Sequence, residues 1–472
     1  MKRIAFKVFV AGIWLYSINS FGKQVQDTLV MDFKEYLGYV KKFHPVAKQA
    51  DLVLNSAEAN LLKARGGFDP KIEVDYSQKE FKNTEYYDIL NATFKIPTWF
   101  GIELKGNFEQ NEGVYLNPER TVPDDGLYSA GISVPVAQGL LINDRMATLR
   151  KAKAFRQQSI ADRDLLINDI LYNASLAYFN WLQAYQESLL YQDFLDNAWQ
   201  RFRGIKKSAE AGDKAAIDTV EAKIAYQNRN LGLSQAQLNL TKARLELSNF
   251  LWIANNVPVE LRPSVIPDLE LKRSIDIAFE VEGRLLSDIN LQNHPKLQSL
   301  NYKIEGLDVD RRLKANKLLP YIGLEYNFLT ETPDIGDSYI TDNYKAGVTF
   351  KFPLFLRKER GDLRLAKNKL QDKEYEFLST ELEIKNKISA VFAEIGSLVE
   401  QTNLIEDIVQ NYNKLLNAET RKFSFGESSI FLINSRENSL IDSQLKNIQI
   451  QNKWLEAKAK LFKTLSINPS NL

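Results

Sequence analysis

The sequence predicts an α+β membrane protein that combines long α-helical hairpins with antiparallel transmembrane β-strands. Three observations lead to this fold class. Apolar residues recur every seven positions over two long stretches, as in helices that pack lengthwise against neighbours. Shorter stretches alternate strictly between apolar and polar residues, as in strands with one apolar face. Both patterns occur twice in the same order, so the chain consists of two internal repeats.

The repeats are related by constant offsets. Two His-Pro pairs, His44-Pro45 and His294-Pro295, lie 250 residues apart, and Gly212 and Gly426 lie 214 residues apart. The first repeat, residues 23–252, is expected to contain a helix at 32–66, strands within 71–136, a long helix at 143–208 and a returning helix at 214–252. The second repeat, residues 291–466, is expected to contain a helix at 295–318, strands within 321–353, a long helix at 360–421 and a returning helix at 428–465. A linker, 253–290, with a short helix near 272–286, and a tail, 467–472, complete the chain.

Residues 1–22 have the features of a secretory signal peptide. Lys2, Arg3 and Lys7 precede an apolar stretch at 8–16, which is followed by small residues near Gly22. This apolar run is too short for a membrane-spanning helix. We therefore expect an exported mature chain that begins at Lys23.

The composition excludes several classes of function. The chain has 61 Lys and Arg residues against 60 Asp and Glu residues, and the two signs are interspersed, so nothing supports nucleic-acid binding. It has no cysteine, which excludes disulfides, cysteine metal centres and thiol nucleophiles. His44 and His294 are the only histidines, and a histidine beside proline at a helix start is ordinarily structural rather than a metal ligand. We expect no metal and no cofactor.

The helical segments carry apolar stripes with a seven-residue period. The stripe of the second long helix comprises Phe377, Ile384, Val391, Leu398, Ile405 and Tyr412. The returning helices have stripes of their own, which comprise Ile224, Leu231, Leu238, Leu245 and Trp252 in the first repeat and Ile441, Ile448, Leu455 and Phe462 in the second. Such helices pack lengthwise against neighbours, and Gly212 and Gly426 mark the turns between them.

About six strands, each about 9–11 residues long, have one apolar and one polar face. A soluble sheet that packs one face on a core shows the same alternation. Strand length, aromatic residues and the export signal favour transmembrane strands, with Ile132, Val134, Val348 and Phe350 facing lipid. Six strands cannot close a membrane barrel, because the unpaired backbone groups of the edges cannot be left in lipid. We therefore expect several chains to close it.

The ordered elements resemble outer-membrane efflux proteins of the TolC type over residues 32–466. The short segments that carry this resemblance are His44-Pro45, Phe68-Asp69-Pro70, "PVAQG" at 135–139 and "AGDKAAIDTVEAK" at 211–223. The resemblance implies a homotrimer with an outer-membrane β-barrel closed by trimerisation and a long periplasmic α-barrel. It further implies the exit duct of a tripartite efflux or secretion system, which engages a periplasmic adaptor (a membrane fusion protein) and an inner-membrane transporter.

The resemblance also places a periplasmic tip and gate at the two glycine turns. The residues concerned are Gly212, Asp218, Glu221, Gly426, Ile430 and Phe431. Asp218 and Glu221 form either a ring of carboxylates that acts on cations or charges that favour the start of a helix. The family usually has four strands per chain, whereas residues 86–112 here read as an additional hairpin. Either the barrel has nearer 18 strands or this hairpin lies outside the ring.

Two other classes of function fit the sequence less well. An exported enzyme would need a catalytic motif, and the sequence contains no G-x-S-x-G, HExxH, P-loop or Rossmann fingerprint. We therefore do not expect an enzyme. An exported coiled-coil scaffold or adaptor without a membrane pore would share the helices but not the strands. The transported substrate stays open, because ducts for drugs, metals and polypeptides have similar walls.

Overall fold

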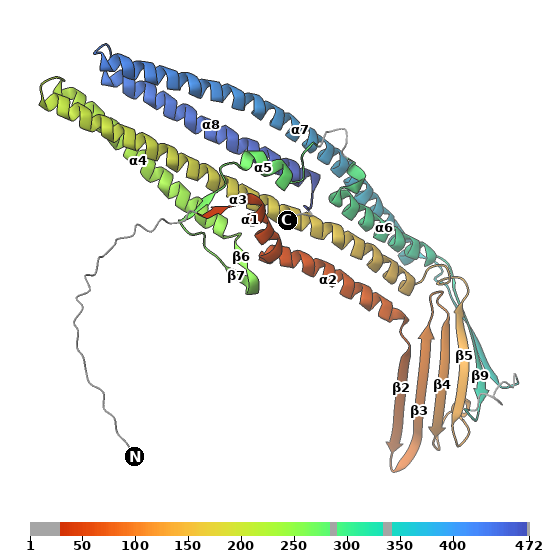
Figure 1. Ribbon diagram of the computed structural model, residues 1–472. Coiled ribbons are helices and arrows are strands. Elements are labelled where there is room, and N and C mark those ends of the chain that lie inside the picture. The colour runs from red at the N-terminus through yellow and green to blue at the C-terminus, as the bar shows by residue number, and fades with distance from the viewer. Residues whose placement is uncertain (1–28, 284–289, 334–341, 470–472) are drawn as a thin grey trace, which may run out of the picture.

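The computed structural model describes residues 29–283, 290–333 and 342–469. The molecule is elongated, with paired helices along most of its length and one sheet at one end (Figure 1). The expected signal peptide at 1–22 lies outside the described residues, as do parts of the expected linker and tail. Within the described ranges, no helix is long and apolar enough to cross a membrane.

Two helical hairpins form the body. The first consists of α3 (Asp144–Glu210) and α4 (Ala216–Ser248), and the second of α7 (Arg357–Ser424) and α8 (Ile430–Leu465). These bounds lie close to those expected from the sequence. The heptad stripe of α7 is buried at Ile384, Val391, Leu398 and Ile405, as the spacing predicts. The α8 stripe is also buried at Ile441, Leu455 and Phe462.

Both hairpins turn on a glycine with positive φ. Gly212 has φ +87° and Gly426 has φ +78°, a region that only glycine adopts without strain. The residue after each glycine donates its backbone N–H to a carbonyl of the preceding helix: Asp213 to Ser208 and Glu427 to Lys422. These bonds satisfy carbonyls that the end of a helix leaves without partners.

The first helix differs from expectation. A single helix at 32–66 was expected, whereas the structure has α1 (Phe33–Phe43) and α2 (Pro45–Arg65), separated at His44. His44 is extended, with φ −63° and ψ 135°, because the residue before a proline is disfavoured in the helical region. His294 caps α6 (Pro295–Asn316) in the same way, so the two His-Pro pairs are equivalent helix starts.

The helices form one layer of four columns. α2 and α4 follow one another along one side of α3, and α6 and α8 follow one another along its other side (Figure 1). α7 packs on α6 and α8 at the far side of the layer. The layer therefore ends in α2 and α4 on one side and in α7 on the other.

The largest apolar core lies midway along the layer, where α1 and α5 (Leu271–Ala278) cover the long helices. It is rich in fully buried aromatic side chains, namely Phe33, Tyr36, Tyr178, Phe179, Trp181, Phe279 and Phe462. Tyr178 donates to the carbonyl of Met31 at 2.6 Å. Two short sheets join this region: β1 (Leu29–Met31) with β8 (Val265–Pro267), and β6 (Trp252–Ile253) with β7 (Val257–Pro258). The short linker helix is thus α5, and it anchors the linker to the core.

The main sheet has six antiparallel strands in the order β10-β9-β5-β4-β3-β2. The first repeat supplies β2 (Lys71–Phe81), β3 (Thr84–Pro97), β4 (Glu103–Glu112) and β5 (Leu127–Pro135). The second supplies β9 (Tyr321–Thr330) and β10 (Tyr344–Lys351). Residues 86–112 therefore belong to the same sheet as the other strands, and the hairpin that they form does not lie outside it.

The cap of α6 requires a neutral histidine. Nδ1 of His294 accepts the backbone N–H of Lys296 at 3.1 Å, and Nε2 lies 3.0 Å from the carbonyl oxygen of Thr464. Because a carbonyl only accepts, the ring proton is on Nε2 and Nδ1 keeps its lone pair. Burial lowers the pKa of His294, and the Thr464 carbonyl partly opposes this effect. Burial likewise lowers the pKa of His44.

We predict that acid weakens the fold through these two caps. Below about pH 6.5 the unfolded chain takes up protons that the folded histidines resist, so the free energy of unfolding falls with pH. His294→Asn keeps a capping side chain without titrating. The melting temperature of the detergent-extracted protein should fall less between pH 7.5 and 5 in the variant than in the wild type, and least in the double variant with His44→Asn. An unchanged fall in the double variant would contradict the assignment.

Candidate functional site: the amphipathic sheet and the hairpin tips

One face of the six-stranded sheet is apolar from edge to edge. Residues paired directly across antiparallel strands share a face. The register therefore joins the apolar positions of all six strands into continuous rows, such as Ile72, Phe94, Gly106, Ala130, Phe328 and Tyr344. The next row toward the helices contains Ile96, Leu104, Ile132, Tyr326 and Ala346. The apolar positions of the single strands thus form one continuous surface.

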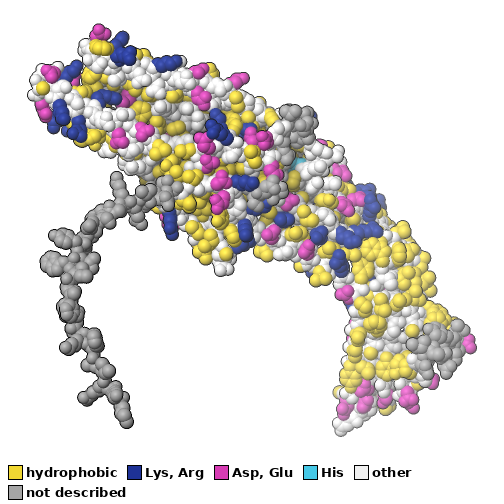
Figure 2. Space-filling model, viewed as in Figure 1, with side chains coloured by type: hydrophobic (Ala, Val, Ile, Leu, Met, Phe, Trp, Pro, Cys, Tyr) yellow, Lys and Arg dark blue, Asp and Glu magenta, His cyan; other side chains and the backbone are white. Residues whose placement is uncertain are grey.

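This apolar face is exposed in the single chain. Ile72 and Val348 are each 75% exposed, and Phe350 is 65% exposed. Figure 2 shows hydrophobic side chains spread over the sheet, with Asp and Glu gathered at the ends of the strands farthest from the helices. Contiguous exposed apolar surface of this extent marks a membrane or protein interaction site.

The four residues expected to face lipid all lie on this surface. Ile132 and Val134 are neighbours on β5, and Val348 and Phe350 are neighbours on β10. Val348 pairs with Leu324, which in turn pairs with Val134. The structure thus brings residues from both repeats onto one face.

The opposite face of the sheet is polar and tied together across the strands. Thr93 donates to Asn107 at 2.7 Å, and Lys95 forms an ion pair with Glu73. Lys105 on β4 reaches over β5 to Glu325 on β9, with 3.1 Å between the charged atoms. These groups have both signs of charge, so the face is suited to contact with water.

Gly131 on β5 allows this polar ladder to cross the sheet. It pairs with Lys105 on one side and with Asn327 on the other. A Cβ at this position would lie 2.0 Å from Oδ1 of Asn327. Only glycine therefore leaves room here for the side chains of the neighbouring strands.

The free edges of the sheet coincide with the free edges of the helical layer. β2 follows α2, and β10 runs into α7, so the same two sides of the molecule are unpartnered in both parts. The α4 stripe lies on such a side. Its members Ile224, Leu231, Leu238 and Leu245 are 52%, 71%, 48% and 50% exposed, unlike the buried stripe of α8. One chain is therefore a panel with two open sides.

The glycine turns lie at the end of the helices opposite the sheet (Figure 1). Asp218 and Glu221 are partly exposed on the first turns of α4, close to the Gly212 turn. Phe431 is 64% exposed beside the Gly426 turn. The expected tip residues of both repeats are therefore found at the same end of the molecule.

Ile430 differs from the expectation that it faces a partner or the aperture. Its side chain is only 1% exposed, because it packs with Ile205 of α3 and Ala222 of α4. Phe202 and Phe423 cover this small cluster, and Lys214 lies over the ring of Phe423 at 4.5 Å. In this conformation Ile430 holds the two hairpins together at the tip.

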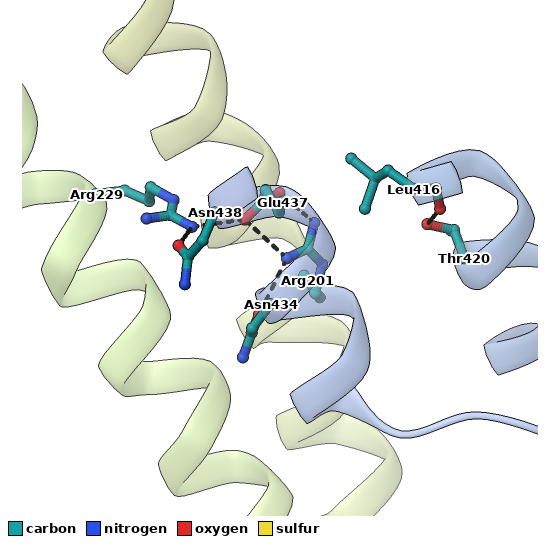
Figure 3. A network of polar contacts seen from close by, with 7 residues as sticks. All are labelled: Arg201, Arg229, Leu416, Thr420, Asn434, Glu437 and Asn438. Atoms are coloured by element: carbon teal, nitrogen blue, oxygen red, sulfur yellow. Dashed lines mark hydrogen bonds and ion pairs between the residues drawn. The ribbon is translucent and has the colours of Figure 1, made fainter. Parts of the chain in front are cut away.

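A buried ionic network joins the same hairpins slightly farther from the tip (Figure 3). Glu437 of α8 is 1% exposed and accepts from two arginines of the first hairpin. Arg201 of α3 binds both of its carboxylate oxygens, at 2.6 and 3.1 Å, and Arg229 of α4 lies 3.3 Å away. Asn434 and Asn438 accept further bonds from these guanidinium groups.

Sequence reasoning missed this network, although one signal was present. Ile430, Ile433, Glu437 and Leu440 follow the spacing of the buried face of α8, so Glu437 is a charged residue within an apolar stripe. A charge at such a position needs a buried partner. The sequence does not tell which residues, more than 200 positions away, supply it.

The comparisons with known proteins bear on this geometry. Residues 286–466 match the model of the family described as "Outer membrane efflux protein". Over these residues the chain is similar to that family. The match covers the second repeat, and the internal duplication extends the same architecture to the first. No curated protein is similar enough in sequence to match the chain.

Solved structures of outer-membrane channels share the fold. The open state of the Neisseria gonorrhoeae MtrE outer membrane channel aligns with a TM-score of 0.66 at 12% identity, covering 92% of this chain and 88% of that chain. The outer membrane protein VceC of Vibrio cholerae gives 0.64 at 12% identity, with 92% and 96% covered. The Campylobacter jejuni CmeC outer membrane channel gives 0.63 at 14% identity, with 92% and 85% covered.

We predict that Glu437→Gln loosens the tip. Removing the carboxylate leaves the buried Arg229 and the partly buried Arg201 without a counter-charge, and breaking a buried pair typically costs about 3–5 kcal/mol. Amide hydrogen exchange should accelerate in α8 near residue 437 and in the facing turns of α3 and α4. The control is Glu383→Gln, which removes only an exposed ion pair with Lys387 and should leave exchange at the tip unchanged. Equal exchange in the two variants would show that the network does not hold the hairpins.

Proposed function

We propose that this chain forms an outer-membrane efflux channel, in which three copies enclose one duct from the periplasm to the cell exterior. The carrying observation is the apolar face that spans six strands and stays exposed in the single chain. In water this surface would associate or aggregate, whereas in a bilayer it lies in its preferred solvent. The polar face then lines the pore.

The open edges support assembly from several copies. Strands in lipid must have all of their backbone groups paired, so β2 and β10 need partners. β2 runs away from the helices and β10 runs toward them, because strand direction alternates across the six strands of the sheet. β2 of one copy can therefore pair antiparallel with β10 of the next. Three copies is the number that the resemblance implies.

The helical edges support the same arrangement. The α4 stripe at Ile224, Leu231, Leu238 and Leu245 repeats every seven residues on an open side. On the other open side, α7 exposes Leu378, Leu382, Leu404, Ile408 and Leu415. Two exposed apolar stripes at opposite edges of one panel are suited to pack against each other in neighbouring copies, which closes a helical barrel in the periplasm.

The tip is the proposed contact with a periplasmic adaptor and, through it, an inner-membrane transporter. Exposed apolar side chains surround the two turns, notably Phe425 at 74%, Phe431 at 64% and Ile217 at 69%. Gly212 and Gly426 set these turns, and Asp218 and Glu221 lie just behind the first of them. An exported scaffold without a pore is the second candidate. It is disfavoured because it gives no role to the exposed apolar sheet.

The membrane assignment makes a face-specific prediction. Phe350→Lys places a charge on the apolar face and should cost about 2–4 kcal/mol near the bilayer centre, thereby lowering the yield of assembled protein in the outer membrane. The neighbouring Thr349→Lys places the same charge on the polar face and should be tolerated. Membrane yield and heat-modifiability in gel electrophoresis measure both variants. Equal loss from the two substitutions would rule out a lipid contact of this face.

The acidic pair near the tip has two interpretations that can be separated. If Asp218 and Glu221 form a ring across three copies, Asp218→Ala with Glu221→Ala should change single-channel conductance and weaken block by divalent cations. If they only favour the helix start, the double variant should lose about 1 kcal/mol of stability or less and keep its conductance. Glu246→Ala, at the exposed far end of α4, is the control. Conductance and cation block equal to wild type would remove the ring from the mechanism.

A further inference from the structure

The first repeat contains one strand hairpin more than the second. Ile72 of β2 and Ile322 of β9 are related by the same offset as the His-Pro pairs, so these two strands correspond. β5 and β10 correspond as well, because each runs into the long helix of its repeat. In the second repeat, β9 pairs directly with β10, and only residues 331–343 separate the two strands in the sequence. In the first repeat, the hairpin of β3 and β4 stands between the equivalent strands, and it is therefore an insertion.

The inserted hairpin is fully integrated into the sheet. Its apolar side chains Phe94 and Phe108 continue the face that the neighbouring strands expose. Its polar side chains continue the other face through the pairs Lys95 with Glu73 and Lys105 with Glu325. The insertion adds two strands, so the edges β2 and β10 still run in opposite directions. It enlarges the wall without changing how copies can join.

We propose that this hairpin widens the membrane exit, so that the channel passes larger hydrated solutes than a barrel without the hairpin would admit. This inference rests on the proposed function, since the width follows only if three copies close one barrel. With strands about 4.8 Å apart and tilted by about 40°, eighteen strands enclose a backbone diameter of roughly 36 Å, against roughly 24 Å for twelve. Barrels of about this strand number hold open aqueous channels.

The chemistry of the inserted wall fits such solutes. On the polar face, β3 and β4 carry the amides of Asn91, Asn107 and Asn111 and the hydroxyl of Thr93, together with Lys95, Lys105 and Glu109. Neutral hydrogen-bonding groups and paired charges bind water well and select neither sign of charge strongly. The same face also carries Ile89 of β3, which is paired with Asn111 of β4. A wall made mostly of hydrogen-bonding groups lets a large hydrated solute pass.

The width can be measured with thiol reagents, because the chain contains no cysteine. Thr349→Cys places one thiol on the polar face of β10, near its junction with the helices. Polyethylene-glycol maleimides of increasing size, added outside intact cells, must cross the barrel to reach it. We compare the full chain with a variant that lacks residues 82–112, in which the loop after β4 joins β2 directly to β5. The largest polymer that labels the full chain should be roughly 1.5 times as wide as the largest polymer that labels the variant.

Matched thiols separate the possible failures. Val348→Cys, on the apolar face, should resist these water-soluble reagents, and labelling equal to that of Thr349→Cys would overturn the proposed membrane channel itself. If Thr349→Cys is labelled and Val348→Cys is not, but the largest polymer that labels Thr349→Cys is the same in the full and the shortened chain, only the widening is overturned. If the shortened chain does not assemble, Thr93→Cys and Asn107→Cys in the full chain decide the matter. The widening predicts the same limit at these sites as at Thr349→Cys, near that of eighteen strands, and a limit near that of twelve overturns it.

Discussion

The proposed channel depends on one constraint, which is that a strand edge cannot stay unpaired in lipid. Within one chain, β2 and β10 end the sheet without partners, and α2, α4 and α7 end the helical layer on the same two sides. Because the open strand edges and the open helix edges coincide, a neighbouring copy in the proposed assembly would pair the strands and cover the apolar stripes together. That assembly would also account for the stripe that α4 exposes and the equivalent α8 buries.

Register converts this constraint into two different surfaces. Every strand alternates, but only direct pairing of apolar with apolar positions across all six strands yields one apolar face and one polar face. Gly131 shows how closely the polar face is built, since Lys105 and Glu325 meet across a position where a side chain would collide with Asn327. The inserted hairpin obeys the same register, and for that reason it can enlarge the sheet without breaking either face.

The sequence predicts what depends on local pattern. The long helices, the glycine turns and the alternating strands follow from spacing alone, and the structure has them close to the expected positions. The helix expected at 32–66 runs through the His-Pro pair, and it misses the break at His44 although Pro45 disfavours a helical residue before it. Pairing over long distances could not be read: Glu437 meets Arg201 and Arg229 only through tertiary packing. Alternation also does not tell which strands lie beside residues 86–112. Their place in the sheet follows only from the strand pairing in the structure.

The contacts between the two hairpins differ along their length, and this difference determines where the proposed duct can move. At the middle, α1, α5 and the long helices bury seven aromatic side chains in one apolar core, which separates only at a large loss of buried area. At the tip, the hairpins meet through a small cluster around Ile430 and through the carboxylate of Glu437. Ion pairs can exchange partners with water once the helices shift, whereas an apolar core cannot. A change in aperture is therefore expected to be confined to the tip, with the core as its fixed end.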